Sequence, residues 1–232
     1  MRHRIFTDTL SPVVVVTGDE FHHSVRVVRL RAGEEVELFD REGNAARGTV
    51  QALERDRAVI VTGEPLPSRE SPLVMHLAMA IIQLEKFELV LQKATELGVR
   101  SIVPLVTDRI ELRAERYAGK MERWNKIVFE AVKQSGRSRV PPVHEPVKFA
   151  EAVATPGLKI LFDAEEPRNP EEPRNPEELT IFIGPEGGWS DEELRMAREQ
   201  QCLFERLGPR RLRAETAAIV AAAVIASRFG DL

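Results

Sequence analysis

Two stretches near the carboxyl terminus carry residue types that could bind a ligand. The first is Gly-Pro-Glu-Gly-Gly-Trp at 184–189, which follows a short apolar, β-branched run at 179–183. Gly184, Gly187 and Gly188 lack a Cβ, so the backbone can turn sharply there and a ligand can approach it closely. A buried strand that ends in such a turn is typical of ligand sites at the carboxyl ends of strands in open α/β sheets.

A helix is predicted to begin directly after this turn. Ser190 and Glu193 have the spacing of a capping box, in which the serine caps the helix and the glutamate caps the serine. Glu186, Asp191 and Glu192 add further negative charge, which repels the phosphate groups that helix N-termini otherwise favour. The spacing also misses the dinucleotide and Walker A patterns. We therefore expect a neutral or cationic ligand, or else a turn that is only structural.

The second stretch lies between a strand predicted at 203–207 and an apolar helix predicted at 217–229. It contains Arg210, Arg211, Arg213, Glu215 and Thr216. These charges could form an ion-pair cluster. Two successive loops at one edge of a sheet make a ligand site the better interpretation.

The elements that position both loops alternate between strand and helix from residue 73 onwards. Apolar runs predict strands at 73–82, 99–106, 158–162, 179–183 and 203–207, and helical spacing predicts helices at 85–98, 117–138 and 149–154. This alternation is typical of an α/β domain with a parallel sheet. The hexapeptide at 165–170 is repeated at 171–176 and, with its prolines, is predicted to be a surface loop.

Residues 1–68 are predicted to form a small β-rich unit. Its strands are expected at 12–17, 35–39, 46–53 and 58–62, with one helix capped by Asp19 that has Phe21, Val25 and Val28 on one face. The other surface of that helix carries histidines and arginines, which are either a solvated face or a surface for phosphates. Prolines at 65–72 mark a linker, so we expect domains at 1–68 and 73–232.

Composition narrows the class of protein. The longest apolar stretches, 73–82 and 217–226, are shorter than the ~20 residues that span a bilayer, so no membrane partner is expected. The single Cys202 fits a buried thiol in a reducing, cytoplasmic compartment, and the histidines show no metal-ligand spacing. With a net charge of −4, contact with a nucleic acid would require a local basic surface.

Several motifs together resemble the ribosomal RNA small subunit methyltransferase E family of the SPOUT superfamily. They are Gly-Pro-Glu-Gly-Gly-Trp-Ser at 184–190, Leu-Gly at 207–208, Leu-Arg-Ala-Glu-Thr-Ala at 212–217, and the runs at 22–29, 92–99 and 130–137. Ala214 and Lys133 stand where the family usually has Thr and Glu. The resemblance spans nearly the whole chain.

The resemblance implies an α/β fold, with a SPOUT-type trefoil-knotted domain after a small PUA-like β-barrel, and a homodimer built through the knot. It implies S-adenosylmethionine as methyl donor and N3 of a uridine in 16S rRNA of the small ribosomal subunit as acceptor. A sulfonium cation without phosphate agrees with the acidic glycine turn. Another SPOUT enzyme acting on a tRNA base or ribose, and a non-catalytic RNA-binding protein, remain alternatives.

The resemblance also assigns roles to single residues. Arg213 is predicted to stabilise negative charge on the uracil oxygens, and Glu186 or Glu215 to accept the N3 proton. The predicted cofactor residues are Leu161, Phe162, Ile183, Gly184, Pro185, Gly187, Gly188, Leu207, Gly208, Leu212, Ala214 and Thr216. The predicted RNA-binding residues are Arg26, Arg29, Arg31, Gln134 and Arg137.

Overall fold

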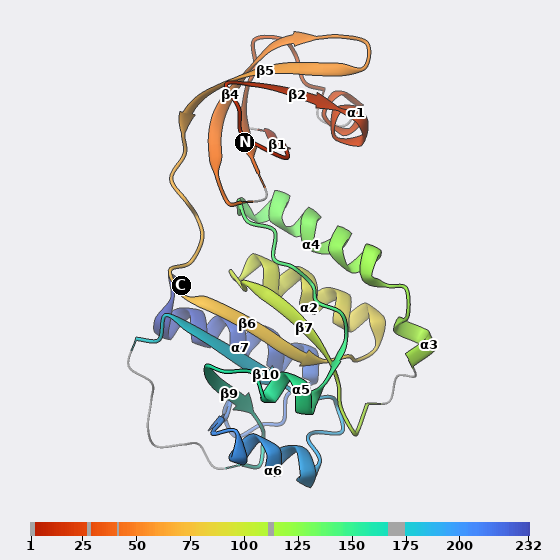
Figure 1. Cartoon of the computed structure of the whole chain (residues 1–232), viewed down its shortest axis with the longest axis vertical. Helices are drawn as coiled ribbons and strands as arrows, with labels where there is room; N and C mark the ends of the chain where they lie inside the picture. The colour runs from red at the N-terminus through yellow and green to blue at the C-terminus, as the bar shows by residue number, and fades with distance from the viewer. Residues whose placement is uncertain (1–2, 27–28, 41, 111–113, 167–174) are drawn as a thin grey trace. The chain divides into compact units, whose positions relative to one another are not determined.

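The computed structural model describes residues 3–26, 29–40, 42–110, 114–166 and 175–232 of the chain (Figure 1). Contacts divide the chain into two compact units. The N-terminal unit runs to Glu70 and includes Val132–Val140, whereas the C-terminal unit holds Ser71–Ala131 and Pro141–Leu232. Among the described residues, no helix is both long and apolar enough to cross a membrane.

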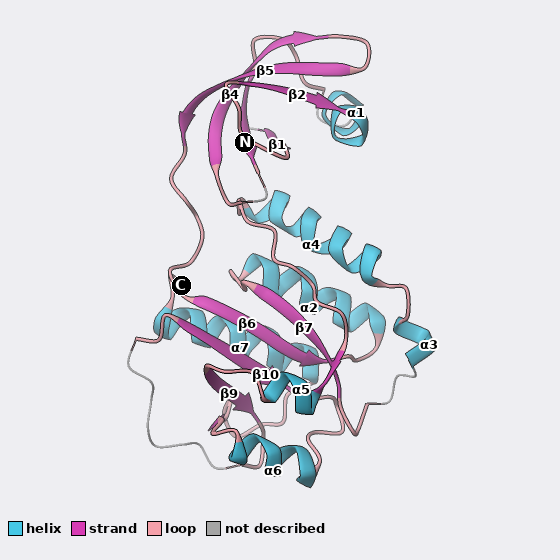
Figure 2. Cartoon of the chain, viewed as in Figure 1, coloured by secondary structure: helices cyan, strands magenta, loops and turns pink. Residues whose placement is uncertain are grey.

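The N-terminal unit is built on a five-stranded mixed sheet in the order β1-β3-β4-β5-β2. The strands are β1 (His3–Phe6), β2 (Val13–Thr17), β3 (Glu35–Phe39), β4 (Ala45–Leu53) and β5 (Arg57–Pro65). Only β1 and β3 pair in parallel. The sheet curves but has two edges, β1 and β2, so it is a half-barrel (Figure 2). The four predicted strands are present; β1 was missed because it is short and carries His3 and Arg4.

The helix of this unit, α1 (Gly18–Arg26), follows β2 directly. Phe21 is buried in the core below the sheet, as its spacing predicts, and Val25 packs against the same core. Asp19 was predicted as the cap, but the helix already begins at Gly18, so Asp19 lies in its first turn and complements the helix dipole there. Val28 lies outside the described residues.

Residues 132–140 join the N-terminal unit through buried ion pairs. Arg137 Nη2 lies 2.6 Å from Glu70 Oε2, and the two side chains are only 5% and 14% exposed. Arg4 donates to Glu37 Oε1 at 2.8 Å and to the carbonyl oxygens of Val132 and Arg137. Because a buried charge is costly unless it is paired, these contacts fix the segment firmly to β1 and β3.

The C-terminal unit is an α/β domain with a six-stranded sheet in the order β11-β9-β10-β6-β7-β8, in which every pair is parallel. The strands are β6 (Val74–Ala80), β7 (Ser101–Val106), β8 (Val147–Lys148), β9 (Leu158–Phe162), β10 (Glu178–Ile183) and β11 (Leu203–Glu205). The helices are α2 (Leu84–Glu96), α3 (Ala114–Tyr117), α4 (Met121–Ser135), α5 (Phe149–Val153), α6 (Asp191–Glu199) and α7 (Ala214–Phe229).

Helices cover both faces of this sheet, as Figure 1 shows. The helices α5 and α6 pack on one face, where Phe149 and Ala197 meet Phe182 of β10. The helices α2 and α7 contact each other, and α7 also contacts β6 and β10. Because both faces are covered, the central strands are apolar throughout, which is why their runs were recognisable in the sequence.

Several elements differ from the sequence prediction, and β6, β7 and β11 are each shorter than the predicted runs. The helix expected at 117–138 is interrupted, because Gly119 adopts a left-handed φ of 70° between α3 and α4. The two-residue β8 is too short to leave a pattern. The helix α7 was predicted from 217 and begins at Ala214, so Glu215 and Thr216 belong to its first turn.

One face of α7 is buried, but the helix is not buried all round as its composition suggested. Its buried residues are Ala214, Ala218, Ala221, Ala222, Ile225 and Ala226. The opposite face carries Ile219, Val220 and Val224, which are only half-buried. An apolar surface on both sides of a helix usually contacts protein on both sides.

Candidate functional site

A cavity of about 520 Å³ lies at the carboxyl ends of β9, β10 and β11, within the C-terminal unit. Its walls are the loops that follow these strands, at 163–166, 184–189 and 206–212, together with the first turn of α7. Arg109, from the loop after β7, also lines it. The strand ends therefore meet where the topology of a parallel sheet predicts a ligand site.

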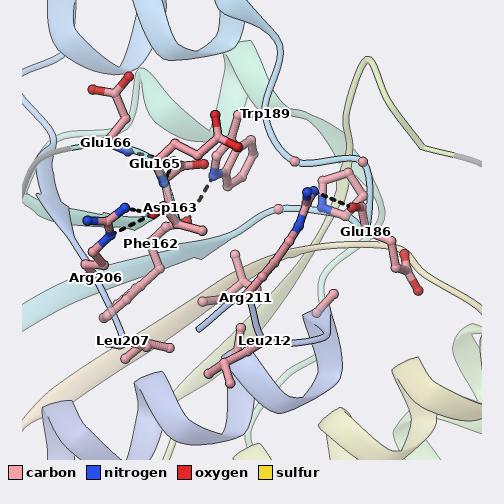
Figure 3. A pocket seen from close by; sticks show the side chains of 18 of the residues that line it. Phe162, Asp163, Glu165, Glu166, Glu186, Trp189, Arg206, Leu207, Arg211 and Leu212 are labelled. Atoms are coloured by element: carbon pink, nitrogen blue, oxygen red, sulfur yellow. Dashed lines mark hydrogen bonds between the residues drawn. The ribbon is translucent and has the colours of Figure 1, made fainter. Parts of the chain in front are cut away.

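The floor of the cavity is apolar. It consists of Phe162, Ile183, Leu207, Leu212, Ala214 and Ala217, and Figure 3 shows Leu207 and Leu212 beside α7. Trp189 is buried and donates from Nε1 to the carbonyl oxygen of Phe162 over 3.1 Å. This bond joins the end of β9 to the glycine turn after β10. Apolar side chains of this kind suit an aromatic ring.

The glycines of the turn are required by their surroundings. A Cβ on Gly184 would lie 3.0 Å from the Trp189 ring, and a Cβ on Gly187 would lie 3.1 Å from Cβ of Arg109. Gly188 adopts a φ of 70°, and its N–H donates to the carbonyl oxygen of Pro185 over 2.9 Å. A side chain at these positions would therefore strain the turn or reshape the cavity.

Two arginines hold the turn from outside. Arg109 donates to the carbonyl oxygen of Gly187 over 3.1 Å, and Arg211 donates to that of Glu186 over 3.2 Å. The N–H groups of Glu186 and Gly187 have no acceptor within the described part of the chain. These two N–H groups are therefore available as donors to a ligand.

The predicted capping box at Ser190 is present. Glu193 N–H donates to Ser190 Oγ over 3.2 Å, and Ser190 N–H donates to Glu193 Oε2 over 2.8 Å. Ser190 also donates to Asp108 Oδ2 over 2.6 Å, and Asp108 N–H donates to Glu193 Oε1. Burial raises the pKa of the Glu193 carboxyl. The box thus fixes the start of α6 and joins it to the loop after β7.

The charges around the cavity have both signs. Asp163 Oδ1 accepts from the N–H groups of Glu165 and Glu166, and Arg206 donates to the carbonyl oxygen of Ala164. Besides these acids and Glu186 and Asp191, the lining includes Arg109, Arg206, Arg210 and Arg211. A ligand without phosphate was predicted from the acidic residues next to the turn alone. That prediction did not take these lining arginines into account, so the charge of the site was only partly predicted.

The structure brings most of the predicted cofactor residues together. Ten of the twelve line the cavity, and Leu161 and Thr216 do not. Leu161 is fully buried in the core beside Phe182, because successive residues of a strand point to opposite faces. Thr216 is exposed in the first turn of α7.

The three predicted catalytic residues are separated. Glu186 lines the cavity, and its Oε1 lies 3.3 Å from Lys86 Nζ. Arg213 is exposed at the N-cap of α7 and does not line the cavity. Glu215 does not line it either, and its Oε2 is buried without a hydrogen-bond partner among the described residues.

The predicted RNA-binding residues belong to the N-terminal unit. Arg29, Arg31 and Gln134 are exposed, whereas the side chain of Arg26 lies outside the described residues. Arg137 is buried in its ion pair with Glu70, so its guanidinium is committed to the fold, and we withdraw it as an RNA contact. Most of the repeated hexapeptide, 167–174, also lies outside the described residues.

Comparisons with known proteins agree with this geometry. Residues 69–226 match the model of an RNA methyltransferase domain, and residues 16–62 match that of an RNA methyltransferase PUA domain. Ribosomal RNA small subunit methyltransferase E of Bacillus subtilis is 31% identical over 234 residues, covering 93% of this chain and 90% of that protein. The chain belongs to the methyltransferase E family. The family member from Synechocystis is 33% identical, over 93% of this chain and 73% of that protein.

Solved structures of similar proteins contain the cofactor. Methyltransferase E from Neisseria gonorrhoeae, bound to S-adenosylmethionine, superposes with a TM-score of 0.90 at 32% identity over the full length of both chains. A putative methyltransferase from Legionella pneumophila, also with bound cofactor, gives a TM-score of 0.89 at 34% identity, again over both full chains. The fold of the family therefore extends over both units of this chain.

The residues of this methyltransferase E chain fit S-adenosylmethionine. The cavity has the volume of a small-molecule site, its apolar floor suits adenine, and the turn offers unpaired N–H donors. The acidic loop at 163–166 suits positive charge on the ligand, and Arg206, which donates to that loop, suits a carboxylate.

Sequence reasoning missed Arg109, Asp163 and Trp189. Arg109 comes from a loop 75 or more residues before the turn, and only the sheet order places it there. Asp163 and Trp189 each follow a predicted element directly. Their position at the end of a strand or turn was a usable signal.

Proposed function

We propose that this chain transfers a methyl group from S-adenosylmethionine to N3 of a uridine in 16S rRNA of the small ribosomal subunit. The observation that carries the proposal is the cavity shared by the glycine turn and the loop after β11, in a chain of the methyltransferase E family. When bound, the cofactor supplies an electrophilic methyl group on a positively charged sulfur.

The apolar floor and the N–H donors of the turn would hold the cofactor in one orientation. The residues proposed for this are Phe162, Ile183, Gly184, Pro185, Gly187, Gly188, Leu207, Gly208, Leu212 and Ala214. Methyl transfer requires the attacking nitrogen in line with the methyl carbon, so positioning contributes much of the rate. Trp189 and the two arginines on the carbonyl oxygens keep the turn in place.

Uracil N3 must lose its proton during the reaction. We assign the role of proton acceptor to Glu186, because it is the predicted catalytic carboxylate that lines the cavity. Arg211 replaces Arg213 as the donor that stabilises negative charge on the uracil oxygens, since Arg211 lines the cavity and Arg213 does not.

The two parts of the chain would have different roles, one in RNA binding and one in methyl transfer. We propose that residues 1–68 form a PUA-like RNA-binding domain with Arg29 and Arg31 as contacts, and that residues 73–232 form the methyltransferase domain. Gln134 would add a contact from the segment 132–140, which joins the N-terminal unit. The half-buried apolar face of α7 supports a homodimer. We also propose a SPOUT-type knot, which family membership supports, and a cytoplasmic site of action, which ribosomal RNA as the substrate supports.

Nucleoside analysis of ribosomal RNA tests the function. A strain lacking the gene should have no 3-methyluridine in its 16S rRNA, and the gene in trans should restore it. A loss confined to tRNA would support another SPOUT activity instead. Unchanged modification in all RNA, together with no cofactor binding by calorimetry, would indicate a non-catalytic RNA-binding protein.

A further inference from the structure

Besides Arg206, which donates to the carbonyl oxygen of Ala164, three exposed arginines line the cavity. Arg210 and Arg211 come from the loop after β11, and Arg109 comes from the loop after β7. We call these three residues the arginine rim. This concentration of positive charge is a local feature, because the chain as a whole carries a net charge of −4.

The hydrogen bonds of the arginine rim use only a few of its N–H donors. Arg109 and Arg211 each donate to one carbonyl oxygen of the turn. Arg210 has no hydrogen bond or ion pair with any described residue. A guanidinium carries several N–H donors in a planar fork, so all three residues retain donors. Since an unpaired exposed arginine adds little to folding stability, Arg210 is available for a ligand.

We propose that Arg210 contacts the phosphate backbone of the RNA next to the target nucleotide, with Arg109 as a second contact, while Arg211 keeps its role at the uracil oxygens. This proposal rests on the proposed function and adds to it a substrate-contact surface on the methyltransferase domain itself. Phosphate oxygens are the usual partners of arginine forks in nucleic-acid complexes. Figure 3 shows the acidic side chains Glu165 and Glu166 on a different side of the cavity from Arg211.

Placement of the rim matches what the reaction needs. A base can reach a cofactor on the cavity floor only across the edge of the cavity, and its phosphates then lie at that edge. A protein with negative net charge attracts RNA only through such local basic surfaces. Arg210 and Arg109 thus hold the backbone while the base enters the cavity.

Salt dependence of RNA binding tests the proposal. We measure the Kd for a 16S rRNA fragment from low to moderate salt, using wild type, Arg210→Ala and Arg210→Lys. Arg210→Ala should bind about tenfold more weakly at low salt, and its log–log slope should be smaller by roughly 0.7–1, the value for one lost phosphate contact. Arg210→Lys should keep most of the slope, because the charge remains.

The matched control is Arg195→Ala, an exposed arginine on α6 that pairs with Glu192 and Glu199 and lies outside the cavity lining. Its slope should equal that of wild type. Calorimetry with S-adenosylmethionine should give the same Kd for Arg210→Ala as for wild type.

Two results would overturn the proposal. One is an unchanged slope and RNA affinity in Arg210→Ala. The other is weaker cofactor binding with an unchanged slope, which would mean that Arg210 contacts the cofactor carboxylate. Formation of 3-methyluridine by wild type is measured separately. The absence of this product would contradict the proposed function. The salt dependence of the RNA Kd tests the phosphate contact by Arg210 independently.

Discussion

Single side chains connect the loops of the cavity, and Trp189 is the clearest case. It is buried beneath the glycine turn, and its Nε1 bonds the last residue of β9. Trp124, the other tryptophan, is equally buried but packs against Phe87, and its Nε1 has no hydrogen-bond partner in the described structure. The two tryptophans therefore differ in one hydrogen bond and in their distance from the site.

We predict that Trp189→Phe weakens S-adenosylmethionine binding about fivefold to tenfold. The variant keeps an aromatic ring but leaves the carbonyl oxygen of Phe162 without its donor, a loss of about 1 kcal/mol. Isothermal titration calorimetry measures the change. Trp124→Phe is the control and should bind the cofactor like wild type, although it lowers thermal stability. Equal affinity in both variants would mean that Trp189 does not position the turn.

Among single residues, the sequence identified those that lie within or next to a motif along the chain. Gly184 to Gly188 and Leu207 to Leu212 could be predicted because motif and site coincide along the chain. Arg109 could not, because its approach to Gly187 depends on how β7 and β10 are ordered in the sheet. Arg137 lies in one of the motifs that carry the family resemblance, yet its partner Glu70 lies in a different segment and buries it.

Among the elements, α6 has the best-defined start. Its capping box was recognisable in the sequence because Ser190 and Glu193 satisfy each other's backbone N–H groups locally. The start of α7 was misplaced, since Arg213 provides no side-chain cap and the apolar pattern begins only after Glu215 and Thr216. Short elements such as β1, β8 and α3 had too few residues to show a period.

We predict that Ser190→Ala lowers the free energy of unfolding by about 1 kcal/mol, because the N–H of Glu193 loses its acceptor. The bond to Asp108 is lost as well. Thermal denaturation should show a Tm lower by roughly 2–4 °C. Ser227→Ala, at an exposed position near the end of α7, should leave Tm close to that of wild type. A Tm equal to wild type for Ser190→Ala would argue against the cap.

At the scale of the whole chain, sequence and family resemblance contributed differently. The βαβ rhythm and the half-barrel strands could be predicted from periodicity. Periodicity could not show that residues 132–140 leave the C-terminal unit and join the N-terminal one, because that depends on long-range ion pairs. The knot and the dimer came only from the resemblance, since no local pattern encodes either.

The Glu70–Arg137 pair predicts an acid-sensitive stability. Burial raises the pKa of Glu70, but hydrogen bonds and charge from Arg137 and the N–H groups of Ser138 and Arg139 outweigh it, so the net pKa is lowered. A lowered carboxyl pKa contributes stability above the ordinary value of 4.5 that is lost as pH falls through the folded-state pKa. Urea denaturation from pH 7 to pH 3 should therefore show a smaller fall for Glu70→Gln than for wild type.

Glu54→Gln, at an exposed surface pair, is the control for that series and should follow the wild-type curve. If Glu70→Gln also follows the wild-type curve, the buried pair does not govern the acid response.

The half-buried face of α7 predicts a dimer in solution. Val224→Arg places a charge on that apolar face, so sedimentation velocity should show a dimer for wild type and a monomer for the variant. Val15→Arg, at an exposed apolar position of β2, should remain dimeric. A monomeric wild type would contradict the dimer.

The most direct test of the account is a crystal structure of this chain with S-adenosylmethionine. The account predicts the adenine on the floor formed by Phe162, Leu207 and Leu212, with the glycine turn donating N–H groups to it. The sulfonium methyl should face the edge that carries Glu186 and Arg211. A cofactor bound elsewhere, or contacting only one of the two loops, would contradict it.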